Sequence, residues 1–256
     1  LFRSHANQAR ITTFPLNDKE NCLFSEDVIA FAREKGYFDG KNKEFSFSDT
    51  YAPLDFGAMR FCEARVWSAF RIANPEMDKY KAYAKGESLT RMPLYIKPAN
   101  KLSHNDVANI MRDHYEGTDL DMTQDIGAGS YKVPYRWRPM TFDVDGKTYF
   151  MERAIATQQT GFWFVAQMRQ WLPAHIGGIL WFGVDDAASS VLVPMYCGIE
   201  KIPFEFSVGN GDMLTFNWNS AFWIFNWVSN MAYNRYNVMI EDIKKVQTEL
   251  EQQMNA

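Results

Sequence analysis

Apolar residues recur at helical spacing in three stretches of the N-terminal half of the chain. The first follows Ser25, a residue type that caps helix N-termini, and ends at Gly36. The second covers residues 59–72, with Phe61 and Cys62 among the apolar side chains expected to face inward. The third begins at Ser103, where Ser-His-Asn-Asp resembles a capping box, and is expected to end near residue 117. Each pattern predicts an amphipathic helix.

The centre of the chain is rich in strand signals. Asp145-Gly146 is the strongest of these, because a two-residue Asp-Gly turn closes β-hairpins, and it predicts a hairpin of residues 133–144 and 147–157. Three further strands are predicted at residues 161–168, 178–184 and 190–196. Residues 3–14 carry no helical apolar stripe and are followed by Pro15, so we expect a strand there too.

From Ser220 to about residue 254 the pattern predicts one or two long helices. The first part is apolar nearly all round and is expected to be buried, whereas the part after Tyr236 has one apolar and one charged face. We find no repeat, low-complexity tract or linker. The sequence therefore predicts an α+β fold with antiparallel strands and long C-terminal helices, organised as a single domain over residues 1–256.

Charge and polarity exclude two classes of partner. The 256 residues include 27 basic and 31 acidic side chains mixed along the chain, so the concentrated basic face that nucleic acid requires is not expected. The longest uncharged run, residues 213–234, contains several asparagines and serines that would be costly in lipid. We therefore expect neither a nucleic acid nor a membrane as partner.

The cysteines and histidines do not form a familiar site. The three cysteines are far apart and the four histidines have no helical metal-binding spacing, so we expect no disulfide framework, no metal and no other cofactor. A papain-like arrangement would use Cys62 with His114, but Cys62 falls on the apolar side of its predicted helix, where a thiol is usually inert. The sequence has no Gly-x-Ser-x-Gly motif, so nothing in it supports a catalytic serine.

Several polar residues are candidates for binding a ligand. Arg136 and Arg138 alternate with aromatic residues in a predicted strand, so both arginines would point to one face and could clamp a carboxylate. Ion pairs or a solvated face are the alternative. Arg60 and Arg65 lie in an otherwise apolar helix, where at least one should be buried and paired. Gln158 follows a strand and could line a pocket or belong to a polar turn.

Several runs of residues point to one family. They are Ala52-Pro-Leu-Asp-Phe-Gly, Arg60-Phe-Cys-Glu-Ala-Arg-Val-Trp, Asp125-Ile-Gly-Ala-Gly-Ser, Pro134-Tyr-Arg-Trp-Arg-Pro, Glu152-Arg-Ala-Ile-Ala-Thr-Gln-Gln-Thr-Gly-Phe, Trp181-Phe-Gly-Val-Asp-Asp and Pro194-Met-Tyr-Cys-Gly-Ile. Through them essentially the whole chain resembles the dipeptidase A family, cysteine dipeptidases of the N-terminal-nucleophile hydrolase superfamily. The resemblance implies that the chain is the central and C-terminal part of an αββα sandwich.

The resemblance also implies a nucleophile outside this chain. Members of the family start their mature chain with a cysteine, whose own α-amino group, with a pKa of about 7.7–8 when free, can act as the base for the thiol. Cys22, Cys62 and Cys197 do not lie in that context. We therefore expect a missing N-terminal segment of the same protein to be a partner of this chain, and the segment alone to be inactive.

Three residues resemble parts of the catalytic machinery. Ala6-Asn7 is similar to a Thr-Asn step in the related bile-salt and penicillin acylases, whose Asn side chain helps to bind the oxyanion. The alternative is that Asn7 is a turn residue at a strand end. Those relatives also place an arginine near the nucleophile, in a helix after an Asp-Phe step. Asp55-Phe56, followed by Arg60 and Arg65, is similar, and Arg65 is the first choice.

The implied reaction is hydrolysis of the peptide bond of a dipeptide through an acyl-enzyme. Arg136 and Arg138 would then bind the substrate carboxylate, and Asp185 or Asp186 its amine. An amidase or acyltransferase of the same superfamily, or a non-catalytic binding module, are the alternatives; a homo-oligomer is compatible with all of them. Unpaired cysteines favour the cytoplasm, whereas a leader peptide ahead of Leu1 would make the protein secreted.

Overall fold

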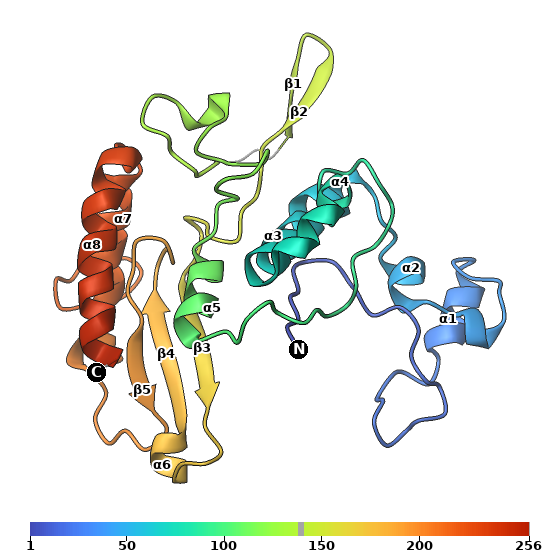
Figure 1. Ribbon diagram of the computed structural model, residues 1–256, viewed down its shortest axis with the longest axis horizontal. Coiled ribbons are helices and arrows are strands. Elements are labelled where there is room, and N and C mark those ends of the chain that lie inside the picture. Colours follow the sequence, from blue (N-terminus) through green and yellow to red (C-terminus); the bar gives the residue numbers. More distant parts are fainter. Residues whose placement is uncertain (138–140, 256) are drawn as a thin grey trace. The chain divides into compact units, whose positions relative to one another are not determined.

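The computed structural model describes residues 1–137 and 141–255 (Figure 1). The chain divides into two compact units, Leu1–Lys101 and Leu102–Ala256. Two such units can still belong to one domain, so the expected single domain stays a prediction. Arg138 lies outside the described residues.

The first unit is mainly helical. Its elements are α1 (Val28–Glu34), η1 (Asn42–Glu44), α2 (Phe47–Tyr51), the π-helix η2 (Ala58–Glu63), α3 (Ala64–Ala73), η3 (Pro75–Tyr80) and α4 (Lys81–Ala84). The helix expected after Ser25 is confirmed as α1, but Ser25 does not cap it, because the N-cap position is taken by Asp27. Gly36 follows the helix with a φ of +72°, a conformation that glycine adopts easily after a helix end. A small core beneath α1 contains Ile29, Ala32 and Phe45.

The strand expected at residues 3–14 is wrong. The only β-type pairing here among the described residues is an isolated antiparallel bridge between Phe2 and Ile96. The carbonyl oxygens of Ile11 and Thr12 accept hydrogen bonds from the amides of Ser48 and Phe47, each at 3.0 Å. These amides belong to the first turn of α2 and have no acceptor within the helix. The extended segment therefore caps a helix where a ladder was expected.

The helix expected at residues 59–72 forms as η2 followed by α3, but its inner side differs. Phe61 and Cys62 are only half-buried, whereas Arg60 and Glu63 are buried. The π-helical hydrogen bonds of η2 reach one residue further than those of an α-helix and change which side chains face inward. This shift brings two charged residues into the interior of the first unit.

The second unit combines helices with two antiparallel sheets. Its elements are α5 (His104–Met111), η4 (Ile126–Ala128), β1 (Thr141–Val144), β2 (Lys147–Phe150), β3 (Phe162–Met168), α6 (Ala174–Gly177), β4 (Gly178–Val184), β5 (Val193–Tyr196), η5 (Phe204–Phe206), α7 (Ala221–Ala232) and α8 (Tyr236–Asn255). The capping box at Ser103 is confirmed, although α5 already ends at Met111. The hairpin turn at Asp145-Gly146 is confirmed with shorter strands than expected.

The larger sheet has the order β3-β4-β5, with Val165 opposite Trp181 and Trp181 opposite Pro194. One face carries Trp163, Val165, Ile179 and Trp181, which pack with Ala108 of α5 and Met254 of α8. Along β3 the alternate residues Phe162 and Phe164 remain exposed. One face of the sheet is therefore covered by helices, and the other is apolar and open along β3.

The segment 135–137 is not a strand, and the expected alternation of arginines and aromatics is wrong. Tyr135 and Arg136 are both buried, while Trp137 is exposed. Tyr135 packs against Tyr236 and Ile240 of α8. This segment packs against a helix and is not paired with a neighbouring strand. Its side chains therefore need not alternate between two faces, and two consecutive ones can both point inward.

The two C-terminal helices are confirmed, but α7 is not buried as expected. Its buried residues are the small Ala221, Ser229 and Ala232, while Trp227 is 48% exposed. α7 lies against β4 and α8 against β5, and both stand beside the sheet in Figure 1. In the described part of the chain we find no helix that is both long and apolar enough to cross a bilayer.

Candidate functional site

Asn7 and Arg65 are in direct contact in the first unit. Arg65 Nη2 donates a hydrogen bond to Asn7 Oδ1 at 2.6 Å, and Arg65 Nε donates to the Phe61 carbonyl oxygen at 2.9 Å. The second bond runs back along the helix that begins at Ala58 and fixes the direction of the guanidinium group. The structure thus joins the extended N-terminal segment to the start of α3 at two residues that the sequence singled out.

The contact determines how the Asn7 amide is oriented. A guanidinium group has donors only, so the amide must turn its oxygen toward Arg65. Asn7 Nδ2 then points away with two N–H groups, and among the described residues it meets no acceptor. Asn7 is exposed, so this donor is accessible to a ligand.

A buried ion pair holds the same two segments together. Arg10 Nη1 lies 2.6 Å from Glu63 Oε2, and both side chains are almost completely buried. The Tyr83 hydroxyl donates to the same carboxylate oxygen at 2.9 Å, and Arg10 Nη2 donates to the Pro93 carbonyl at 2.7 Å. Burial, with the neighbouring Glu63 carboxylate, raises the pKa of Tyr83. Since Arg10 follows Asn7 by three positions and Glu63 precedes Arg65 by two, this network fixes the relative position of Asn7 and Arg65.

Arg60 takes a different place. Its side chain is buried, and Nη1 donates to the Lys85 carbonyl oxygen at 3.4 Å. The expectation that at least one of the two arginines is buried is thus confirmed for Arg60, while Arg65 is the one that reaches Asn7.

In the second unit, Arg136 is held by protein groups. Its guanidinium forms an ion pair with Asp125 and donates to the carbonyl oxygens of Met122 and Val133, at 2.8 and 2.7 Å. This is the arrangement of a structural arginine that closes a loop. The role of Arg136 as a reader of a substrate carboxylate stays a prediction.

Gln158 lies next to Arg136. Its amide nitrogen donates to the Arg136 carbonyl oxygen at 2.8 Å, and both residues line a pocket of about 20 Å³. A pocket of this size holds roughly one water molecule. Arg136 and Gln158 are therefore brought together, around a space much smaller than a dipeptide.

Asp185 and Asp186 directly follow β4 and are both buried. Asp185 has a φ of +64°, and its Oδ2 has no hydrogen-bond partner among the described residues. Burial raises the pKa of Asp185 to about 6, and the Asp186 charge acts in the same direction, while hydrogen bonding from Ser229 opposes it. Asp186 accepts hydrogen bonds from the Tyr135 hydroxyl and from the Ala188 amide, and burial raises its pKa as well.

Comparison with known proteins gives the family. Residues 1–249 match the model of peptidase family C69. The chain belongs to this family. It is 27% identical over 194 residues to a probable dipeptidase of Salmonella dublin, covering 76% of this chain and 39% of that protein. A probable dipeptidase of Latilactobacillus sakei is 25% identical over 81% of this chain and 37% of that protein.

Dipeptidase A of Lactobacillus helveticus is 20% identical over 91% of this C69 chain and 43% of that protein. The chain thus spans about two fifths of the length of these curated relatives. The resemblance seen in the sequence is confirmed at the level of the family.

Sequence reasoning missed Arg10, Glu63 and Tyr83 of this C69 chain. A signal for Glu63 was present, because a carboxylate in an apolar helix must be paired when it is buried. The partner Arg10 lies 53 positions away, so no local pattern could identify it.

The chemistry available to the C69 chain is hydrogen bonding and charge stabilisation. Asn7 offers an accessible amide donor, and Arg65 places a positive charge beside it. Within residues 1–137 and 141–255, no group of three or more His, Cys, Asp or Glu side chains is arranged to hold a metal ion.

Proposed function

We propose that the protein containing this chain is a cysteine dipeptidase that hydrolyses the peptide bond of dipeptides. Membership of peptidase family C69 and the names of the relatives support the proposal. The nucleophile is an N-terminal cysteine outside these residues, and the reaction passes through a tetrahedral oxyanion and an acyl-enzyme.

In this mechanism Asn7 donates to the oxyanion through Nδ2. The observation that carries this role is the Arg65–Asn7 hydrogen bond, because it turns the amide oxygen away and leaves the two N–H groups for the ligand. Removing one such donor typically costs about 2.7–4 kcal/mol of transition-state stabilisation. Arg65 positions the amide and adds positive charge close to where the negative charge develops.

The network below the pair makes this geometry rigid. An oxyanion donor is effective when it is oriented before the reaction and needs no rearrangement. The buried Arg10–Glu63 ion pair, with the Tyr83 hydroxyl, joins the segment carrying Asn7 to the helix carrying Arg65. Arg60, which is buried and donates to the Lys85 carbonyl, ties the start of the same helical stretch to the residues after α4.

The αββα sandwich of N-terminal-nucleophile hydrolases is part of the proposal. In such a sandwich each sheet is covered by helices on one face and by the second sheet on the other. The β3-β4-β5 sheet fits half of this arrangement, since one face packs with α5 and α8 while Phe162 and Phe164 are 61% and 49% exposed on the other. Sheets pack through such apolar faces at about 10 Å.

The proposal extends to recognition of the two termini of the dipeptide. Asp185 is proposed to bind the amine and Arg136, with Arg138 and Gln158, the carboxylate. Support for Asp185 is its unpartnered Oδ2 and its left-handed backbone, a conformation that is concentrated at functional sites. The burial of Asp185 and the protein partners of Arg136 mean that substrate must displace groups to reach either one.

The test uses the complete enzyme with its processed N-terminal cysteine. Dipeptides and N-acyl amides are compared as substrates, and only dipeptides are expected to be hydrolysed. Asn7→Ala is expected to lower kcat about 100- to 1000-fold with little change in unfolding free energy. Asn17→Ala, an exposed asparagine in the same N-terminal stretch, is the matched control. Full turnover by Asn7→Ala would refute the oxyanion role, and cleavage of N-acyl amides alone would refute the dipeptidase.

A further inference from the structure

The second unit contains a polar cleft of about 510 Å³. One wall is α5 with the residues that follow it, and the other is α8. From Lys244 on, the α8 residues that line the cleft recur every three or four positions and so lie on one helix face: Lys244, Gln247, Thr248, Glu251, Gln252 and Asn255. A volume of this size is within the usual range for binding sites.

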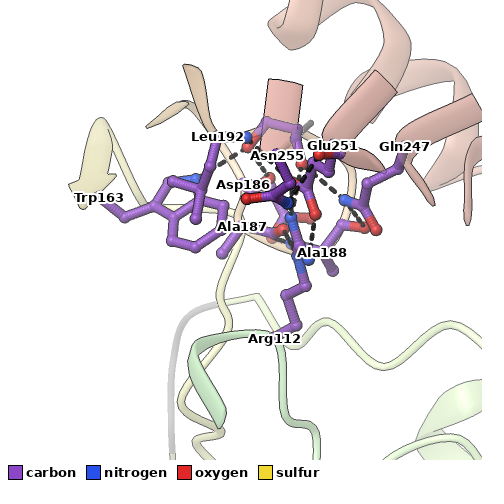
Figure 2. Close-up of polar contacts among 10 residues, drawn as sticks. Arg112, Trp163, Asp186, Ala187, Ala188, Leu192, Gln247, Glu251 and Asn255 are labelled. Atoms are coloured by element: carbon purple, nitrogen blue, oxygen red, sulfur yellow. Dashed lines mark hydrogen bonds and ion pairs between the residues drawn. The ribbon is translucent and has the colours of Figure 1, made fainter. Parts of the chain in front are cut away.

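The floor of the cleft is held by a hydrogen-bonded network (Figure 2). Arg112 donates to both carboxylate oxygens of Glu251, at 2.5 and 3.2 Å, and to the Ala187 carbonyl oxygen at 3.0 Å. Glu251 also accepts from the Leu192 amide at 3.0 Å. Arg112 and Glu251 therefore neutralise each other and form a fixed base for a ligand.

Gln247 adds a hydrogen-bond acceptor to this floor. It is buried, and its hydrogen bonds to the Ser190 and Ala188 carbonyl oxygens all use Nε2. Its Oε1 therefore has no donor among the described residues. An acceptor that is fixed in orientation and left open in a cleft is suited to a ligand N–H group.

The chemistry of the walls selects the class of ligand. Asn105, Asn109, Thr248 and Gln252 make no side-chain hydrogen bond among the described residues, and together they offer both donors and acceptors. Tyr236, the aromatic residue of the lining, is buried and offers no face for stacking on a sugar. Lys244 is the cation of the lining without a described partner, which is too little charge for a polyphosphate. Amide side chains match the alternating C=O and N–H groups of a peptide backbone.

Two charges of opposite sign mark the ends of the site. Glu116 lies near Tyr236, because both line the cleft and His114 contacts both: its Nδ1 is 3.2 Å from Glu116 Oε1, and its ring packs edge-on against the Tyr236 ring with centroids 6.2 Å apart. Partial burial acts to raise the pKa of Glu116, but hydrogen bonds from His114 outweigh it and lower the pKa to about 2, so the carboxylate is ionised. Lys244 follows Tyr236 by eight residues on α8, a separation of about 12 Å along the helix. An extended peptide covers this distance with about three or four residues.

We propose that this cleft binds a short peptide with free termini, its ammonium group at Glu116, its carboxylate at Lys244 and its backbone along the amide side chains. The site would take tri- and tetrapeptides. It is independent of the dipeptide hydrolysis proposed above, because binding here needs neither Asn7 nor a nucleophile.

Isothermal titration calorimetry of the complete protein with tri- and tetra-alanine tests the proposal. Lys244→Gln is expected to weaken binding about fivefold, the upper range for an exposed ion pair. Amidation of the peptide C-terminus should weaken binding of the unaltered chain by a similar factor and have no further effect on Lys244→Gln. Lys245→Gln, the neighbouring lysine outside the cleft, should bind as the unaltered chain does.

Thermal unfolding of each variant shows that it is folded before its binding is interpreted. Asn7→Ala should bind the peptides with unchanged affinity. Peptide binding in the cleft would therefore still be observed if the dipeptidase proposal failed. The proposal is overturned if neither peptide binds, if Lys244→Gln binds as tightly as Lys245→Gln, or if Asn7→Ala abolishes binding.

Discussion

Arg65 Nη2 donates to Asn7 Oδ1 at 2.6 Å, and this bond joins residues 58 positions apart in the chain. It makes Arg65 the residue that orients the Asn7 amide. A lysine in its place would keep the positive charge but lose the planar guanidinium group, whose Nε also binds the Phe61 carbonyl. Charge and orientation can therefore be separated by mutation.

Arg65→Lys in the complete enzyme is expected to lower kcat about 10- to 100-fold, because a displacement of about 1 Å in a catalytic group can cost that much. Arg65→Met, which removes the charge as well, should lower kcat further. Steady-state kinetics with a dipeptide give the comparison. Equal kcat values for both variants would show that the charge contributes nothing beyond the orientation of Asn7.

Arg10→Met is expected to destabilise the first unit by about 3–5 kcal/mol, because Glu63 would remain buried without a counter-charge. Urea unfolding measures the change. Arg91→Met breaks the more exposed pair with Asp49 and is the control, with an expected loss of at most about 1 kcal/mol.

The double variant Arg10→Met with Glu63→Leu removes both charges. It should recover most of the stability lost in Arg10→Met, since the uncompensated carboxylate is gone. A double variant no more stable than Arg10→Met would show that packing, and not the unpaired charge, causes the loss.

Asp185 should make the stability of the protein depend on pH. Its pKa is 3.8 when unfolded and about 6 when folded, so the folded state binds the proton more tightly. The resulting stabilisation is complete below pH 4 and is lost as the pH rises through 6, by roughly 3 kcal/mol. Urea unfolding between pH 4 and pH 7 measures it.

Asp185→Asn keeps a side chain that tolerates the φ of +64° and removes the titrating group. This variant should lose the part of the fall in stability between pH 4 and pH 6 that Asp185 causes, while the buried Asp186, whose pKa is also raised, keeps its own contribution. Asp242→Asn on the exposed face of α8 should retain the whole fall. An unchanged pH profile for Asp185→Asn would assign the effect to another group.

Arg136→Lys distinguishes a purely structural role of Arg136 from binding of the substrate carboxylate. Loss of the ion pair with Asp125 and of the bonds to Met122 and Val133 is expected to destabilise the protein by about 1–3 kcal/mol. If Arg136 also binds the substrate carboxylate, as proposed, KM for a dipeptide should rise about tenfold in the folded variant. A change in KM of less than threefold would leave Arg136 a structural role alone.

The sequence by itself determined the features that depend on neighbouring residues. The capping box at Ser103 and the Asp145-Gly146 turn are set by hydrogen bonds within a few positions, and the continuous non-polar run of residues 178–184 matches the bounds of β4. The family also followed from the sequence, because its motifs are short runs of consecutive residues.

The tertiary structure alone decided the contacts between distant segments. Residues 3–14 do not form a strand ladder, because their carbonyl groups accept hydrogen bonds from the first turn of α2. Arg136 turns inward because it pairs there with Asp125. The same holds for the pairs Asn7–Arg65 and Arg10–Glu63. A hydrogen bond across 50 residues depends on how the whole unit packs, and local spacing carries no information about it.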